Sequence, residues 1–239
     1  DSRWKNFKNT LKRFSTDEIA GAKLRVVFRG QSWEIRSDEE GFFETWLELT
    51  SPCEAKLHQV QLELLHPLRQ EQNHLQFTAT VIVPSEQARF GIISDIDDTI
   101  LKSDAISKRK AAQKILFSNA FTREAFEGVA TFYQALHQDI NPLFYVSSSP
   151  WNVYDVLLQF LELNNIPIGP LLLRDWGLSP EEILPTNHAK HKLSMIRQIL
   201  HTYPDLPFLL LGDSGQEDPE IYSQIVSEFP KRIVGIYIR

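Results

Sequence analysis

The pattern of hydrophobic and polar residues changes character near residue 88. Before that point, short runs alternate between apolar and polar positions, and the turn Ser37–Gly41 separates the first run from the others. Alternation with a period of two is typical of strands that bury one face. The size of this region and the spacing of its runs predict a small all-β sandwich over residues 19–88. The runs are Lys23–Phe28, Phe42–Thr50, Val60–Leu65 and Leu75–Val83.

Beyond residue 88, short apolar runs alternate with longer amphipathic segments. Buried strands that alternate with helices predict a parallel sheet with helices on both faces. We therefore expect a Rossmann-like α/β domain with a five-stranded sheet over residues 89–239. The expected strands are Arg89–Ser94, Leu143–Val146, Leu171–Leu173, Phe208–Leu211 and Ile233–Ile238. The expected helices are Thr122–His137, Pro150–Asn164, Lys190–His201 and Asp218–Phe229.

Residues 1–18 have the pattern of a basic amphipathic helix, with Trp4, Phe7, Leu11 and Phe14 at helical spacing. Such a helix either lies in a membrane interface or packs its apolar face on the β domain, and we favour packing. A second basic stretch, Ser107–Ser118, contains lysine and arginine but no acidic residue, and would attract an anionic bilayer.

Composition narrows the classes of protein that fit. The chain has 239 residues, 42% of them hydrophobic, which is ordinary for a globular protein. Its net charge of −6 gives no reason to expect a nucleic-acid partner. No apolar run approaches the roughly 18–20 residues of a membrane span. Its one cysteine, Cys53, fits a reducing compartment, so we expect a cytoplasmic protein, with peripheral membrane contact left open. The oligomeric state is not indicated.

Acidic residues follow the first strand of the α/β region. Asp95 comes directly after it, and Asp97 and Asp98 lie within three further positions. Carboxylates this close repel one another unless a cation is present or one of them carries a proton. Mg²⁺ would supply the missing charge, because it prefers oxygen ligands. The alternative is a solvated acidic turn, which seldom follows directly on a buried strand.

Polar groups follow the second and third strands as well. Ser149 suits a helix N-cap with Pro150 at the first helical position, which leaves Ser147 and Ser148 to bind an anion such as phosphate. Lys190 and Lys192 open the next helix, where a cation opposes the helix dipole. One of the two lysines either pairs with an anion or an acidic side chain there, or is solvated.

The fourth strand is followed by Asp213, and Asp218 precedes a proline that opens a helix. Asp218 has an alternative role as N-cap, whereas Asp213 has none. Gly212 allows close approach of the backbone. Because the carboxyl ends of parallel strands meet at one edge of a sheet, these groups together predict a site for metal-assisted phosphoryl transfer.

Read in order, these residues resemble the four motifs of the haloacid dehalogenase superfamily of phosphohydrolases. The matching elements are Asp95-x-Asp97-x-Thr99, Ser147, Lys192 and Gly212-Asp213-x-x-x-x-Asp218. The longer strings are similar to the catalytic domain of the actin-patch phosphatidate phosphatase family over residues 89–239. These strings are Ser94–Ile100, Val146–Trp151 and Gly212–Tyr222. The resemblance departs at Glu127, where a proline is expected.

The resemblance implies a role for each matched residue. Asp95 would be the nucleophile that forms an aspartyl-phosphate, and Asp97 the general acid and base. Ser147 and Lys192 would hold the phosphoryl oxygens, with Ser148 as a further phosphate-binding hydroxyl. The implied ligands of Mg²⁺ are Asp95, Asp97 through its backbone carbonyl, Asp213 and Asp218.

Members of the superfamily often carry a cap domain, but the two insertion points here hold only Leu101–Asn119 and Arg174–His188. An uncapped site is open to bulky substrates such as lipid head groups. We therefore expect a Mg²⁺-dependent phosphatase that acts on phosphatidate or a related phosphorylated lipid. A phosphatase of soluble phosphate esters or of phosphoprotein is one alternative. A module that binds phosphate or lipid without turnover is another, although both Asp95 and Asp97 are present.

Overall fold

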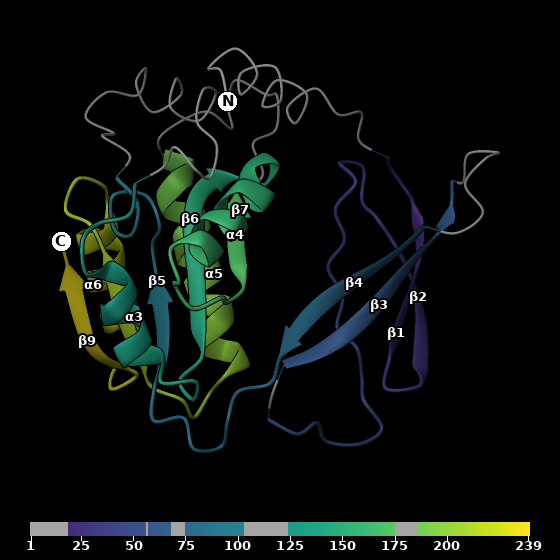
Figure 1. Cartoon of the computed structure of the whole chain (residues 1–239), viewed down its shortest axis with the longest axis horizontal. Helices are drawn as coiled ribbons and strands as arrows, with labels where there is room; N and C mark the ends of the chain where they lie inside the picture. The colour runs from purple at the N-terminus through teal and green to yellow at the C-terminus, as the bar shows by residue number, and fades with distance from the viewer. Residues whose placement is uncertain (1–18, 56, 68–74, 103–123, 175–185) are drawn as a thin grey trace, which may run out of the picture. The chain divides into compact units, whose positions relative to one another are not determined.

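The chain divides into two compact units between Glu86 and Gln87. The predicted helix over residues 1–18 and the basic segment Ser107–Ser118 lie outside the described residues, as do most of the two segments considered for a cap. No helix in the described part of the chain is both long and apolar enough to cross a membrane. The computed structural model describes residues 19–55, 57–67, 75–102, 124–174 and 186–239 (Figure 1).

The N-terminal unit is an antiparallel sheet of four strands in the order β2-β1-β3-β4. The first two strands form a hairpin, and the residues between them, Arg29 and Gly30, both have positive φ, as a tight two-residue hairpin turn requires. The small core of this unit is centred on Val26, Phe28 and Val60. Its strands are β1 (Lys23–Phe28), β2 (Gln31–Arg36), β3 (Leu57–His66) and β4 (Leu75–Ile82).

The all-β prediction for this unit is confirmed, with two differences. The four described strands form a single sheet, so the second layer of a sandwich is not among the described residues. The predicted strand Phe42–Thr50 has no regular structure, and Trp46 within it is 75% exposed. The pattern did not single out β2, yet its short turn places it beside β1 at a low cost in loop-closure entropy.

The C-terminal unit is a parallel sheet of five strands, as predicted, and the strand order is β7-β6-β5-β8-β9. Its central strand β5 (Gly91–Ser94) is flanked by β6 (Leu143–Pro150) and β8 (Phe208–Gly212). The outer strands are β7 (Leu171–Arg174) and β9 (Ile233–Ile238). The helices are α3 (Val129–His137), α4 (Tyr154–Leu163), α5 (Thr186–Thr202) and α6 (Asp218–Glu228), with the 3₁₀ turn η2 (Trp151–Val153) before α4.

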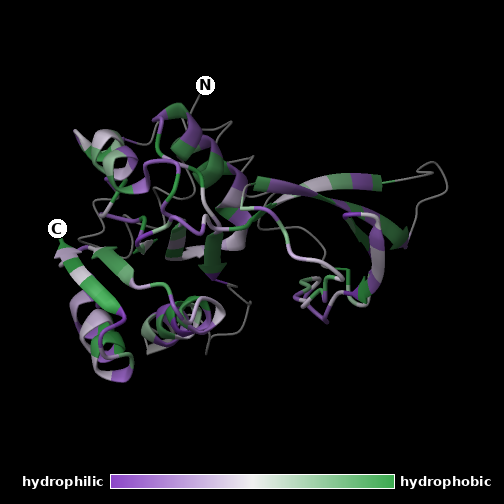
Figure 2. Cartoon of the chain, turned by 90° about the horizontal axis from the view of Figure 1, so that it is seen from below, coloured by the Kyte–Doolittle hydropathy of each residue, from purple (hydrophilic) through white to green (hydrophobic). Residues whose placement is uncertain are grey.

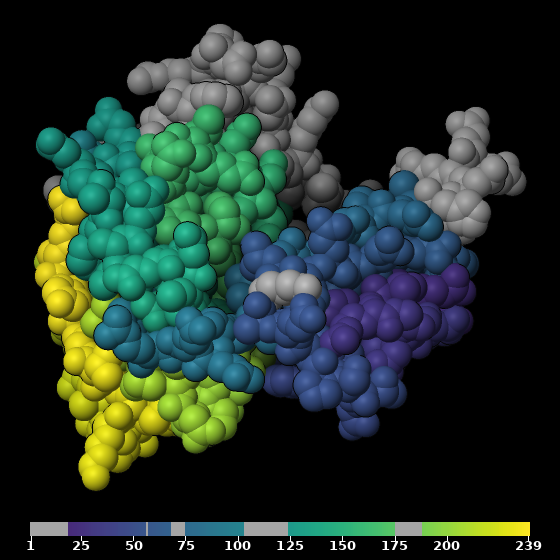
Figure 3. All heavy atoms as spheres, turned by 60° about the horizontal axis from the view of Figure 1, so that its bottom comes forward, coloured from purple at the N-terminus to yellow at the C-terminus, as the bar shows by residue number. Residues whose placement is uncertain are grey.

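Helices cover both faces of this sheet, as predicted, and alternate residues of each strand contact different helices. The inner strands β5, β6 and β8 are rich in hydrophobic residues (green in Figure 2) because both of their faces are buried. The strand residues that pack with α3 and α4 are Ile92, Leu143, Tyr145, Leu171, Leu173, Leu209 and Leu211. Those that pack with α5 and α6 are Ile93, Phe144, Val146, Phe208 and Leu210. At the sheet edge, Tyr237 of β9 meets Phe132 of α3, and these two elements lie side by side in Figure 3 (yellow and teal).

Three helix starts differ from the expectation. Helix α3 begins at Val129 instead of Thr122, since Gly128 before it has a left-handed φ of 77°. Strand β6 continues to Pro150, so the helix expected from that proline is replaced by η2 and α4. Helix α5 begins at Thr186, one turn before Lys190. The last two shifts change the surroundings of predicted site residues.

Candidate active site

The sheet order brings three acidic side chains together. Strands β5 and β8 are neighbours, so Asp95 and Asp213 emerge side by side at their carboxyl ends. Asp218, the first residue of α6, completes the group. One carboxylate oxygen from each of the three residues lies within 4.8 Å of the others, and all three residues are buried. The structure thus places three of the four predicted metal ligands in one cluster by their side chains.

Lys192 lies against this cluster. Its Nζ is 2.8 Å from Asp95 Oδ1 and 2.6 Å from Asp218 Oδ1, and the lysine is only 3% exposed. Lys190 is exposed. The expected reason for pairing was wrong, because Lys192 is in the second turn of α5, beyond the reach of an unfavourable dipole at the helix start. Lys192 pairs with acids because it is buried between them.

The pKa values of the buried acids show that full ionisation of the cluster is unfavourable. Burial raises the pKa of Asp95 well above its usual range, the charges of Asp218 and Asp97 raise it further, and Lys192 opposes them. Burial also raises the pKa of Asp213. Burial would lower the pKa of Lys192, but the carboxylates of Asp95 and Asp218 raise it by more, so the ammonium group stays protonated. Lys192 pairs with Asp95 and Asp218, so a fully ionised cluster of three buried carboxylates has one ammonium group against it, an arrangement that is costly without a further cation.

The donor atoms fit a hard divalent cation. Asp213 Oδ1 accepts the N–H groups of Gly215 (2.5 Å) and Gln216 (3.1 Å). Asp213 Oδ2 is buried and has no hydrogen-bond partner among the described residues. Buried carboxylate oxygens rarely lack a partner, and oxygen ligands are those that Mg²⁺ and Ca²⁺ prefer. A divalent ion would satisfy this oxygen and offset the excess charge.

Asp218 is not the N-cap that local sequence rules favour. Glu217 occupies the cap position of α6, and no side-chain capping bond is made. The Asp218 carboxylate points into the protein, where Oδ1 accepts from Lys192 and Oδ2 accepts the N–H of Asp213 at 3.2 Å. Its position is tied to Gly212, because a Cβ there would lie 2.6 Å from Asp218 Oδ2.

The Gly212→Ala substitution is expected to displace Asp218 and to lower divalent-metal affinity at least about tenfold, since ligand positioning commonly controls affinity by this amount. The added Cβ would also lie 2.8 Å from a ring atom of Tyr222, which is buried in the core. The measurement is Mg²⁺ affinity by calorimetry. The matched control is Gly235→Ala, whose Cβ would lie 3.0 Å from the movable end of Leu209 and at an ordinary contact distance of 3.8 Å from the ring of Tyr237. Equal metal affinity in both variants and the wild type would contradict the proposed placement of Asp218.

Asp97 lies beside the cluster and is held from two directions. Its Oδ2 accepts hydrogen bonds from Ser147 Oγ (3.1 Å) and Ser149 Oγ (2.8 Å). Its backbone carbonyl accepts from Gln216 Nε2 at 3.0 Å. The carboxylate of Asp97 is not part of the three-acid cluster, in keeping with an expected metal contact through the carbonyl.

The predicted N-cap role of Ser149 is wrong. Because β6 runs to Pro150, Ser149 is a strand residue two positions after Ser147, and residues at that spacing point to the same side. Sequence reasoning missed Ser149 and Gln216 as neighbours of Asp97. The period of two in the serine run was a usable signal for Ser149, but none pointed to Gln216.

The turn after β5 orients the Asp95 carboxylate. Asp98 adopts a left-handed φ of 60° and its N–H donates to the carbonyl of Leu101. This turn returns Thr99 to the strand end, where its Oγ1 donates to Asp95 Oδ2 at 3.1 Å. With Lys192 on Oδ1, both oxygens of Asp95 have fixed neighbours. Asp98 and Thr99 thus shape the turn that follows the Asp95 carboxylate.

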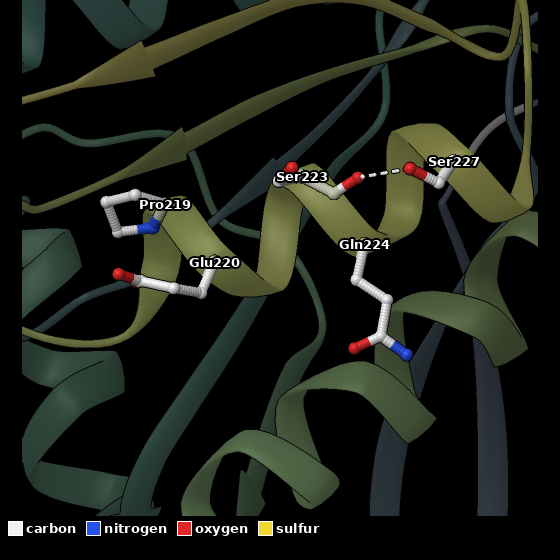
Figure 4. A pocket seen from close by; sticks show the side chains of 5 residues that line it. All are labelled: Pro219, Glu220, Ser223, Gln224 and Ser227. Atoms are coloured by element: carbon white, nitrogen blue, oxygen red, sulfur yellow. Dashed lines mark hydrogen bonds between the residues drawn. The ribbon is translucent and has the colours of Figure 1, made fainter.

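Two hollows lie on the surface of the C-terminal unit. One, of about 310 Å³, reaches from Thr99 and Gly212 outward to Phe132 and Tyr237, and so adjoins the cluster. The other, of about 470 Å³, runs along the polar face of α6, where its lining side chains point outward (Figure 4). Neither hollow is lined by a predicted site residue, but the first is lined by Thr99, whose hydroxyl contacts Asp95, and by Gly212, which lies against Asp218.

Together the parallel sheet, the acidic cluster at neighbouring strand ends and the buried lysine define a domain of the haloacid dehalogenase type. The family described as "Phosphatidate phosphatase APP1, catalytic domain" matches residues 90–239. The chain belongs to this family, which confirms the resemblance seen in the motifs.

Two curated relatives share the C-terminal unit. Phosphatidate phosphatase APP1 of Saccharomyces cerevisiae is 35% identical over 151 residues, which are 62% of this chain and 25% of the relative. An uncharacterized protein of Schizosaccharomyces pombe is 32% identical over 150 residues, 62% of this chain and 24% of that protein. The chain thus spans about a quarter of the length of these relatives.

Solved structures are similar only at a distance. The class C acid phosphatase from Bacillus anthracis with tungstate bound has a TM-score of 0.39 and 18% identity, over 64% of this chain and 69% of that one. A chain of the Pnkp1/Rnl/Hen1 complex has a TM-score of 0.41 and 14% identity, over 65% of this chain and 47% of that one. At this distance neither structure adds to the family assignment.

Proposed function

We propose that this protein is a Mg²⁺-dependent phosphatase that hydrolyses phosphatidate or a related phosphorylated lipid through an aspartyl-phosphate on Asp95. The observation that supports it most is the buried cluster of Asp95, Asp213 and Asp218 with Lys192. Membership of the phosphatidate phosphatase APP1 family supports the choice of substrate.

In the first step, a carboxylate oxygen of Asp95 attacks phosphorus and the ester P–O bond breaks. Thr99 and Lys192 hold the two oxygens of Asp95, so the nucleophile is oriented before substrate arrives. Asp97 gives a proton to the leaving oxygen, which departs as an alcohol. The hydroxyl of Ser147 and the ammonium group of Lys192 offset charge on the phosphoryl oxygens, with Ser148 as a further donor.

In the second step, water attacks the phosphorus of the aspartyl-phosphate while Asp97 accepts its proton. The bond between Asp95 and phosphorus breaks, phosphate leaves, and Asp97 is again protonated for the next cycle. A divalent cation held by Asp95, Asp213, Asp218 and the Asp97 carbonyl would offset the charge that the phosphoryl group brings among these carboxylates.

A phosphate-release screen tests this proposal against its alternatives. Phosphatidate, a sugar phosphate, a nucleotide and a phosphopeptide are each assayed with Mg²⁺ and with EDTA. We expect Mg²⁺-dependent release that is fastest from phosphatidate. Preference for a sugar phosphate or phosphopeptide would favour a phosphatase of soluble esters or phosphoprotein. Release from none of them, with phosphatidate still bound, would favour a non-catalytic lipid-binding module.

Peripheral membrane contact is a further part of the proposal, because phosphatidate resides in bilayers. The basic segment Ser107–Ser118 and the predicted helix over residues 1–18 are the candidates for this contact. Flotation of the protein with anionic vesicles, in forms with and without residues 1–15, distinguishes the two candidates. Equal binding by both forms would remove the N-terminal helix from the account.

A further inference from the structure

We propose that Ser149 is a positioning residue that holds the carboxylate of Asp97 in place for proton transfer to the leaving group. The inference rests on the proposed phosphatase function and adds a residue that the motifs do not assign. It starts from the bond between Ser149 Oγ and Asp97 Oδ2, which at 2.8 Å is the shorter of the two serine bonds to that oxygen.

Ser149 is itself held in a fixed position, so it can fix the Asp97 carboxylate. Its side chain is 6% exposed, and its position at the end of β6 is fixed by a hydrogen bond from its own N–H to Ser147 Oγ at 2.9 Å. Hydrogen bonds from a hydroxyl to a carboxylate are strong and directional. The bond therefore restricts rotation of the Asp97 carboxylate, which would otherwise be free to turn away from the leaving oxygen.

Ser147 cannot supply this support throughout the reaction. A serine hydroxyl has one proton to donate, and Ser147 is proposed to donate it to a phosphoryl oxygen once substrate is bound. In the structure that proton is directed to Asp97 instead. When Ser147 turns to substrate, Ser149 is the serine that still donates to Asp97.

Gln216, which follows the neighbouring strand β8, holds the backbone of Asp97. Its Nε2 donates to the Asp97 carbonyl at 3.0 Å, and its N–H donates to Asp213 Oδ1 at 3.1 Å. Because Gln216 fixes the main chain at Asp97, the freedom that remains is rotation of the carboxylate. Ser149 removes that freedom.

The proposal predicts a dependence on the leaving group. Phosphatidate has an alkoxide leaving group that needs a proton, so its hydrolysis depends on a well-placed Asp97. An analogue with sulfur in place of the bridging ester oxygen leaves as a thiolate, which needs no proton. The two substrates share the same lipid and phosphoryl group, so a general loss of structure or binding would slow both equally.

The test compares kcat/KM for phosphatidate and its bridging-sulfur analogue in Ser149→Ala and the wild type. The value of kcat/KM depends only on the steps up to departure of the leaving group. We expect Ser149→Ala to lower kcat/KM for phosphatidate about 10–100-fold, part of the 10²–10⁴-fold that general acid catalysis supplies, and to change the analogue less than about threefold. Ser149→Thr, which keeps the hydroxyl, is expected to restore most of the lost rate.

The matched control is Tyr145→Phe, which removes another buried hydroxyl bond of β6, the one to the Pro167 carbonyl, outside the site. Tyr145→Phe should lower the stability of the protein but change kcat/KM for the two substrates by the same factor. An equal fall on both substrates in Ser149→Ala, or no fall on phosphatidate, would overturn the role of Ser149. A wild-type protein that hydrolyses neither substrate would instead contradict the proposed function.

Discussion

Asp95→Asn is expected to lower phosphate release at least about 10³-fold while the fold is kept, because an amide cannot act as the nucleophile. The burial that raises the pKa of Asp95 means that its ionised form is disfavoured in the folded protein. Asparagine removes that charge at nearly the same volume, and Lys192 keeps its contact with Asp218. Phosphate release and circular dichroism measure the two parts of the expectation.

The control for this substitution is Asp205→Asn, an exposed aspartate before β8 that should leave the rate unchanged. A folded Asp95→Asn protein that retains the wild-type rate would show that another group attacks phosphorus. The assignment of Asp97 as acid and base would then also fail, since it depends on where the attack occurs.

Removal of divalent metal is expected to reduce turnover to background, and added Mg²⁺ to restore it. Burial and the neighbouring acids disfavour the ionised form of Asp95, so a cation bound among the three carboxylates also stabilises the folded state. A ligand at 100 times its dissociation constant that binds only the folded state adds about 2.7 kcal/mol to the free energy of unfolding. Thermal unfolding with and without Mg²⁺ measures this gain.

Asp213→Asn should lose both the turnover and the stabilisation by Mg²⁺, because Asp213 Oδ2 is a buried carboxylate oxygen without a hydrogen-bond partner among the described residues. Glu220→Gln, an exposed acid in the first turn of α6, should lose neither. Full turnover after exhaustive treatment with EDTA would remove the cation from the account.

The residues that sequence alone located best are those at strand ends. Asp95 and Asp213 each follow a buried apolar run, and a parallel sheet brings such positions to one edge whatever the details of its helices. Either Lys190 or Lys192 was expected to pair with an anion or an acidic side chain or else to be solvated, and the structure pairs Lys192 with Asp95 and Asp218. The cause of this pairing was not expected, because helix α5 begins four residues earlier than the pattern indicated and the dipole argument depended on that boundary.

What sequence rules missed depended on tertiary contacts. Capping rules are local, and they assigned Ser149 and Asp218 to helix ends. In the structure a longer β6 turns Ser149 toward Asp97, and burial turns Asp218 toward Lys192. Gln216 meets Asp97 from a distant part of the chain, a contact that no local pattern encodes. Phe42–Thr50 alternates like a strand, but alternation alone does not supply a neighbouring strand.

The account depends most on covalent attack by Asp95, and trapping of the intermediate tests this directly. Borohydride reduces an aspartyl-phosphate to homoserine, which mass spectrometry locates in the sequence. With phosphatidate and Mg²⁺ present, we predict that homoserine forms at position 95 alone and disappears when substrate or metal is left out. Substrate turnover with Asp95 unmodified, or modification at Asp97 instead, would contradict it.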